Sequence, residues 1–364
     1  LLGVTGMDPQ RLLDFLGNIQ RLLSEGVYVA TYKFALLQSL ADLSVELDSA
    51  EDGSLELPVS LVAEKFIRYY WRQVAPYGDG ILRQNTGRQA AIINQVAGAR
   101  ARFDGALGAA AADRATWDTL QKAVAATVRQ MPLWKLQVIA GRPHEFLYRE
   151  SEYRNGVIRL LPGVPASFRA LHGLVTSLVQ GAWVRQIRRI PANRELLGES
   201  GDLADFLFGS GRASLDKYRA ILNAHQSRRC FYCQKDIKRD GELDHFIAWS
   251  RYPVDLGHNF VFSCSPCNRG KSDFLAHSSH LSRWWRQNVE RAGELADCFD
   301  QENLIHDAAR SQHIAIWAYE QGESAGANAW LRGKEVEPLN REWRSVLRLE
   351  APLDLVAERS ANYE

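Results

Sequence analysis

Hydrophobic residues recur at helical spacing through the first third of the chain. In "MDPQRLLDFLGNIQRLLSEG" the apolar stripe consists of Leu12, Phe15, Leu16, Ile19, Leu22 and Leu23. Asp8 suits the N-cap of this helix, Pro9 its first position and Gly26 the residue after its end. The stretches "ATYKFALLQSLADLSVELD" and "LPVSLVAEKFIRYYWRQV" repeat the pattern. The sequence therefore predicts a packed helical region from about residue 9 onward.

The pattern changes in the middle of the chain. "FLYRE" (146–150) and "GVIRLL" (156–161) suit two short strands, and the polar "SEYRN" between them suggests a hairpin. "PASFRALHGLVTSLVQGAWVRQIRRI" (165–190) predicts a long helix, and helical spacing returns after residue 273. We expect four parts: an N-terminal helical domain over 1–140, a mixed segment over 141–224, a small core over 225–275 and a C-terminal helical region over 276–364.

The totals are those of a globular protein and point to no particular partner. Hydrophobic residues make up 46% of the chain and charged residues 24%. The net charge is +1, so any surface for a polyanion must be local. No apolar run approaches the roughly 20 residues that cross a bilayer, and the opening "LLGVTGMDPQ" lacks the pattern of a signal peptide. We expect a cytoplasmic protein without a membrane partner.

Positive charge gathers at two places in this neutral chain. Arg185, Arg188 and Arg189 lie at the end of the long predicted helix, and Arg228 and Arg229 precede the first cysteine. A solvated helix end that complements the helix dipole would explain the first cluster equally well. The second cluster is diluted by acidic neighbours. Together the two clusters favour nucleic-acid binding, with phosphates as the contacted groups.

Four of the five cysteines form two Cys-x-x-Cys pairs: Cys230 with Cys233, and Cys264 with Cys267. This spacing brings four thiolates onto one tetrahedral Zn²⁺, with bonds of about 2.3 Å. Such a site contributes folding free energy directly. It has no open position, so we expect a structural zinc. Cys298 has the surroundings of a small buried hydrophobe.

The segment between the two pairs carries residues that a structural zinc site does not need. "GELDHFIAWS" places Asp244 beside His245, and neighbours on a strand point to opposite faces, so each side chain can serve a different partner. Asn259 follows before the second pair, and Asn268 comes directly after the last cysteine. These polar residues favour a functional site inside the segment. The alternative is a solvated aspartate at a strand end and a hydrogen-bonded histidine under the zinc.

From Cys230 to Asp273 the sequence resembles the HNH endonuclease family, which is built on the ββα-metal or His-Me finger. The family pattern is a Cys-x-x-Cys, an Asp-His or His-His pair, an asparagine, and a second Cys-x-x-Cys followed by histidine or asparagine, with lysine three residues later. Each of these features is present here in the same order. The resemblance implies a mainly α protein with a small treble-clef-like ββα-metal core that zinc holds together. The substrate-contacting loop, "SRYPVDLGHNF", departs from the family pattern.

The resemblance also implies roles for the residues of this core. His245 would act as general base on a water molecule, because imidazole titrates near neutral pH. Asp244 and Asn268 would hold the catalytic Mg²⁺ or Mn²⁺, and Asn259 would brace the loop and orient the base. The members placed to hold backbone phosphates are Arg269 and Lys271.

The expected function is therefore metal-dependent hydrolysis of DNA phosphodiester bonds. RNA is less favoured, because the sequence carries no module for stacking splayed bases. Long helical flanks around a small nuclease core resemble the layout of bacterial anti-phage or restriction effectors. That layout implies protein partners in a multi-subunit complex, and double-strand cleavage would require a homo-oligomer or two passes. The alternative is a zinc-finger nucleic-acid-binding module, or a partner-activated regulatory subunit without independent cleavage.

Overall fold

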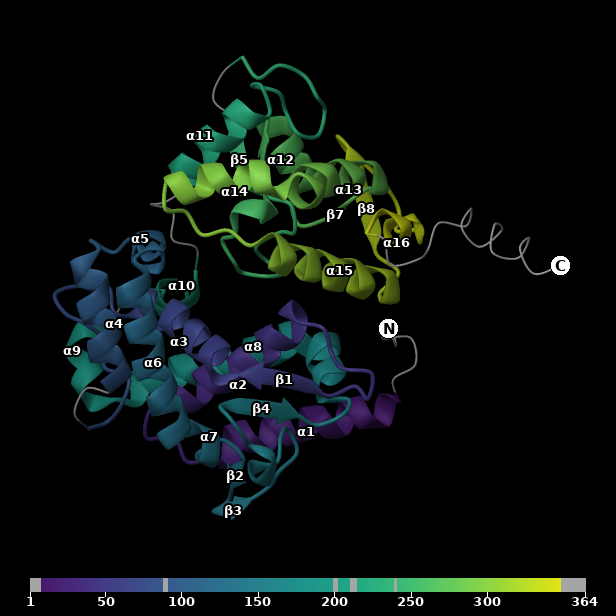
Figure 1. Cartoon of the computed structure of the whole chain (residues 1–364). Coiled ribbons are helices and arrows are strands. Elements are labelled where there is room, and N and C mark those ends of the chain that lie inside the picture. The colour runs from purple at the N-terminus through teal and green to yellow at the C-terminus, as the bar shows by residue number, and fades with distance from the viewer. Residues whose placement is uncertain (1–7, 88–90, 199–201, 210–214, 239–240, 348–364) are drawn as a thin grey trace. The chain divides into compact units, whose positions relative to one another are not determined.

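The chain forms two compact units, Leu1–Arg212 and Ala213–Glu364. The computed structural model describes residues 8–87, 91–198, 202–209, 215–238 and 241–347 (Figure 1). The described residues are mainly helical and carry small sheets. The boundaries expected after residues 140 and 275 fall inside these units. Residues 215–224, which we expected in the segment before the core, belong to the unit with the cysteines.

The first unit is built from helices with two small antiparallel sheets, β1–β4 and β2–β3. Its described helices are α1 Pro9–Glu25, α2 Tyr32–Glu46, α3 Val59–Gln73, α4 Ala91–Arg102, α5 Leu107–Ala112, α6 Arg114–Gln130, α7 Pro132–Lys135, α8 Val164–Arg189, α9 Arg194–Leu197 and α10 Leu203–Phe208. Its described strands are β1 Leu55–Pro58, β2 Val138–Ile139, β3 Arg142–Pro143 and β4 Val157–Leu160. Helix α2 packs against α3 and α8 and forms the centre of the hydrophobic core.

The first helix confirms the sequence prediction at both ends. The Asp8 side chain accepts a hydrogen bond from the Gln10 amide, Pro9 occupies the first position, and Gly26 follows the last residue. Phe15 and Ile19 on the predicted stripe are buried. The sequence pattern therefore fixes this helix locally, and its apolar face turns to the core.

The predicted hairpin between 146–150 and 156–161 is wrong. Strand β4 pairs along its whole length with β1, which lies about a hundred residues earlier in the chain: Leu55 stands opposite Leu160, and Pro58 opposite Val157. The segment 146–150 contributes only an isolated bridge, from Tyr148 to Leu160. The alternation of β4 is real, but its partner is the distant strand β1. Strand β1 leads directly into α3, β4 is followed by α8 after residues 161–163, and both helices pack against α2.

The second unit surrounds the two cysteine pairs. Its described helices are α11 Leu215–His225, α12 Ser265–Lys271, α13 Ser278–Trp285, α14 Ala292–Gln301, α15 Ala308–Ser324 and α16 Glu342–Val346. Its described strands are β5 Glu242–His245, β6 Phe260–Ser263, β7 Leu275–Ala276, β8 Asn328–Arg332 and β9 Glu335–Pro338. Strands β5 and β6 pair antiparallel, and β8 lies between β7 and β9 in a separate sheet.

The arrangement of β5, β6 and α12 positions His245, Asn259 and Asn268. His245 stands opposite Phe260 at the end of the β5–β6 pair where the loop 246–259 connects the two strands. Helix α12 follows β6 and contacts both β5 and β8. Gly270 allows the approach to β8, since a Cβ there would meet the Gly333 carbonyl oxygen at 2.9 Å and the Trp330 ring. The backbone of α12 is thereby held against both sheets.

Candidate functional site

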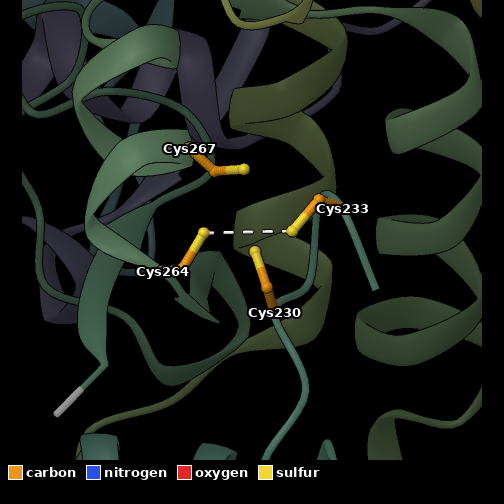
Figure 2. A group of neighbouring side chains, drawn as sticks. All are labelled: Cys230, Cys233, Cys264 and Cys267. Atoms are coloured by element: carbon orange, nitrogen blue, oxygen red, sulfur yellow. Dashed lines mark hydrogen bonds between the residues drawn. The ribbon is translucent and has the colours of Figure 1, made fainter. Parts of the chain in front are cut away.

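The four cysteine thiols converge on one point in the second unit (Figure 2). The sulfur atoms of Cys230, Cys233, Cys264 and Cys267 all lie within 4.8 Å of one another. The Cys233 and Cys264 sulfurs are 3.9 Å apart. A tetrahedral ion with bonds of about 2.3 Å would place its sulfur ligands about 3.8 Å apart. The cluster therefore fits a metal ion such as zinc.

Two local structures present these thiols. Cys230 and Cys233 lie on a tight turn, in which the Gln234 amide donates to the Cys230 carbonyl and Gln234 adopts a φ of 60°. Cys264 is the N-cap of α12 and Cys267 lies in the first turn of this helix. A turn and a helix start expose backbone amides near the sulfurs, which suits the negative charge of thiolates.

The pKa values of these thiols differ from one another. The hydrogen bond with Cys267 lowers the pKa of the Cys230 thiol to about 4. The same hydrogen bond raises the pKa of the Cys267 thiol, and burial raises that of Cys264. Four thiolates in this space would repel one another, so a divalent cation is the group that stabilises all four together.

His245 lies at the end of β5, next to the loop 246–259. Its Nε2 is 2.9 Å from Asp255 Oδ1, and 16% of its side chain is exposed. Its ring packs at 4.6 Å from the Phe260 ring and meets Trp249 edge-on at 5.4 Å. The imidazole is therefore held in one orientation and stays partly exposed to solvent.

Asn259 ties the two ends of the loop together. Its Oδ1 accepts a hydrogen bond from the Ile247 amide at 2.9 Å, and its Nδ2 donates to the Ile247 carbonyl at 3.0 Å. The Phe246 amide donates to the Asn259 carbonyl at 2.7 Å. Asn259 is buried, with 1% exposure. These contacts fix the backbone that follows His245 directly.

Asp244 points away from His245 and into a buried cluster. The Tyr232 hydroxyl donates to its Oδ2 at 2.6 Å, and Lys271 Nζ lies 3.3 Å from both carboxylate oxygens. Lys271 also donates to the His245 carbonyl at 2.9 Å. Burial raises the pKa of the Asp244 carboxyl, against the opposing effects of Lys271 and Tyr232. The adjacent aspartate and histidine thus serve different partners.

This cluster corrects two expectations. Lys271 was expected to hold backbone phosphate, but its side chain is fully buried and its ammonium group is directed at Asp244. Asp244 was expected to be an open ligand for Mg²⁺ or Mn²⁺, yet the lysine already supplies the positive charge beside its carboxylate. The expected pair of oxygen ligands, Asp244 with Asn268, therefore does not fit a divalent ion in this arrangement.

Asn268 has a different partner from the one expected. Its Nδ2 donates to Glu242 Oε2 at 2.7 Å, which lowers the pKa of the Glu242 carboxyl. Glu242 precedes Asp244 by two residues and so lies on the same face of β5. Sequence reasoning missed Glu242, Tyr232 and Asp255 as neighbours of the site. Only the alternation along "GELDH" could have indicated Glu242.

The expected phosphate-binding arginines belong to different units. Arg269 on α12 and Arg228 before the first cysteine are exposed in the second unit, as is Arg229, which pairs with Asp236 at 3.3 Å. The α8 members Arg185, Arg188 and Arg189 are exposed in the first unit.

Among the described residues, no helix combines the length and apolar character needed to cross a membrane.

A comparison with known proteins finds a family match for the first unit. A family model described as "Domain of unknown function (DUF8808)" matches residues 13–207, more than half of the chain and within the first unit. No curated protein and no solved structure matches the chain. The match ends before the first cysteine, so the cysteine cluster and His245 lie outside it. By this match, the chain belongs to the DUF8808 family.

Proposed function

We propose that this protein is an HNH-type endonuclease that hydrolyses DNA phosphodiester bonds, with His245 as the general base. The observation that supports it best is the placement of His245 at the end of a strand, partly open to solvent, beside a loop that Asn259 braces. The cysteine cluster stabilises the same strand pair, because the Phe231 amide between Cys230 and Cys233 donates to the Phe262 carbonyl on β6.

The chemistry can be assigned to groups of this chain. A neutral imidazole takes one proton from a water molecule, the water oxygen forms a bond to phosphorus, and the bond from phosphorus to the leaving 3′ oxygen breaks. Arg269 is the exposed cation on α12 and would hold a backbone phosphate. Since the expected ligands for Mg²⁺ or Mn²⁺ do not fit, no step is assigned to a divalent ion. Zinc in the cysteine cluster would hold the fold.

The test is conversion of supercoiled plasmid by the purified, zinc-loaded protein, with Mg²⁺, with Mn²⁺ and with EDTA in parallel. The decisive variant is His245→Ala, and the matched control is His306→Ala. His306 is a partly exposed histidine of the same unit, paired with Asp300 at 3.0 Å. Zinc content and circular dichroism establish that each variant is folded.

The expected result is nicked or linear plasmid with wild type and with the control variant, and none with His245→Ala. Cleavage only with Mg²⁺ or Mn²⁺ would restore a role for a divalent ion. Cleavage that survives in His245→Ala contradicts the assignment of the base. Absence of cleavage with every protein and metal contradicts independent nuclease activity and leaves the zinc-finger binding module as the better description.

A further inference from the structure

Asp255 reaches back across the loop to the imidazole of His245. Its Oδ1 lies 2.9 Å from His245 Nε2, and 26% of its side chain is exposed. An ionised carboxylate only accepts hydrogen bonds, so the proton of this contact belongs to Nε2. The partner of one ring nitrogen fixes the tautomer of a neutral histidine. The imidazole therefore carries its proton on Nε2 and keeps a lone pair on Nδ1.

The remaining contacts of the ring leave Nδ1 available. Phe260 packs against the ring at 4.6 Å and Trp249 meets it edge-on. Among the described residues, Nε2 is the ring nitrogen of His245 that has a hydrogen-bond partner, and 16% of the side chain is exposed. One nitrogen is bound and the ring plane is fixed, so the open nitrogen has a defined direction.

We infer that Asp255 is the positioning residue of this site, which holds His245 in the tautomer that accepts a proton at Nδ1. The inference rests on the proposed role of His245. When Nδ1 takes a proton from the attacking water, the ring becomes a cation, and the Asp255 carboxylate stabilises that charge through Nε2–H. The leaving 3′ oxygen takes a proton from solvent, so the step balances in protons and charge.

Asp255 links His245 to the loop 246–259. It lies on 246–259, in the segment "SRYPVDLGHNF", and Asn259 ties the ends of that loop to the backbone after His245. The loop therefore brings the Asp255 carboxylate and the Trp249 ring to the base. A change of loop conformation would change the orientation of the imidazole.

Nitrogen-15 NMR of histidine-labelled, zinc-loaded protein tests the hydrogen bond without reference to cleavage. A proton held between Nε2 and a carboxylate exchanges slowly with water and gives an imidazole N–H resonance shifted downfield. We expect this resonance in wild type and its loss in His245→Ala, which assigns it. It should also be lost in Asp255→Ala and kept in Asp297→Ala, a control with the same charge change at an exposed position of α14.

Kinetics on plasmid or oligonucleotide substrate test the consequence. Asp255→Ala should lower kcat by about 100-fold, within the usual range for general-base catalysis, with KM unchanged because Asp255 acts through His245. Asp255→Glu should recover part of the loss, since a longer side chain still offers a carboxylate. Asp297→Ala should leave both constants as in wild type.

The outcomes separate this inference from the proposed function. If wild type cleaves, His245→Ala does not, and Asp255→Ala retains full kcat or the N–H resonance, the positioning role of Asp255 is wrong while the nuclease stands. If wild type does not cleave under any metal condition, the proposed function fails and the positioning role falls with it. Loss of the resonance together with the kcat effect supports both.

Discussion

Replacement of Lys271 by methionine should strongly destabilise the second unit. Lys271 is fully buried, and its ammonium group lies 3.3 Å from both oxygens of Asp244, which is 9% exposed at the side chain. Methionine is close to lysine in length and flexible enough to fill the same space, so little cavity is created. What changes is the charge: Asp244 loses its counterion, and the His245 carbonyl loses a donor.

The magnitude follows from the burial of the pair. Removing one partner of a buried ion pair costs about 3–5 kcal/mol, because the other charge remains desolvated. Lys271→Met should therefore lower the free energy of unfolding by about that amount. Asp244→Asn in the Lys271→Met background removes the stranded charge, so the double variant should be more stable than the sum of the single effects predicts. The expected coupling is about 1–3 kcal/mol.

The measurement is urea unfolding of zinc-loaded protein, with zinc release to a chromogenic chelator as the signal. Zinc release reports the unit that holds the cysteines, whatever the other unit does. Lys334→Met is the matched control, since Lys334 is exposed in the turn between β8 and β9. Its effect should stay within about 0.5 kcal/mol.

Two results would refute this reasoning. A cost below about 1 kcal/mol for Lys271→Met would mean that the lysine is solvated rather than buried against Asp244. Strict additivity of the two substitutions would mean that the groups do not interact. A lysine that contacts phosphate would instead give a raised KM for DNA with little loss of stability.

Three further outcomes are expected. Cys264→Ser, or strong chelation, should abolish binding of one zinc per chain and unfold the second unit, as seen by loss of its far-UV circular dichroism. Burial lowers the pKa of His258, so the unfolded state takes up more protons below about pH 6.5 and stability should fall as pH decreases. His258→Gln should flatten that pH dependence in urea unfolding between pH 5.5 and 7.5, most strongly at the acid end of the range. Arg269→Ala should weaken DNA binding and reduce its salt dependence by about one counterion, whereas an unchanged salt slope in a fluorescence titration would exclude a phosphate contact.

The sequence by itself determined the local features of this protein. The cap of the first helix, the long helix α8 and the two cysteine turns each depend on residues within one or two turns of each other. The cysteine cluster followed from spacing, because each Cys-x-x-Cys segment presents two thiols whatever surrounds it. The separate partners of Asp244 and His245 followed from the alternation of a strand.

Only the tertiary structure decided which side chains meet across long separations. The partner of β4 lies about a hundred residues away in β1, and a nearby alternating segment misled the prediction. Lys271 has the positive charge of a phosphate ligand, but its burial against Asp244 depends on how α12 packs on β5. Asp255 reaches His245 because the loop folds back on itself. Composition and periodicity report what a residue can do, whereas burial and the partner within reach decide what it does.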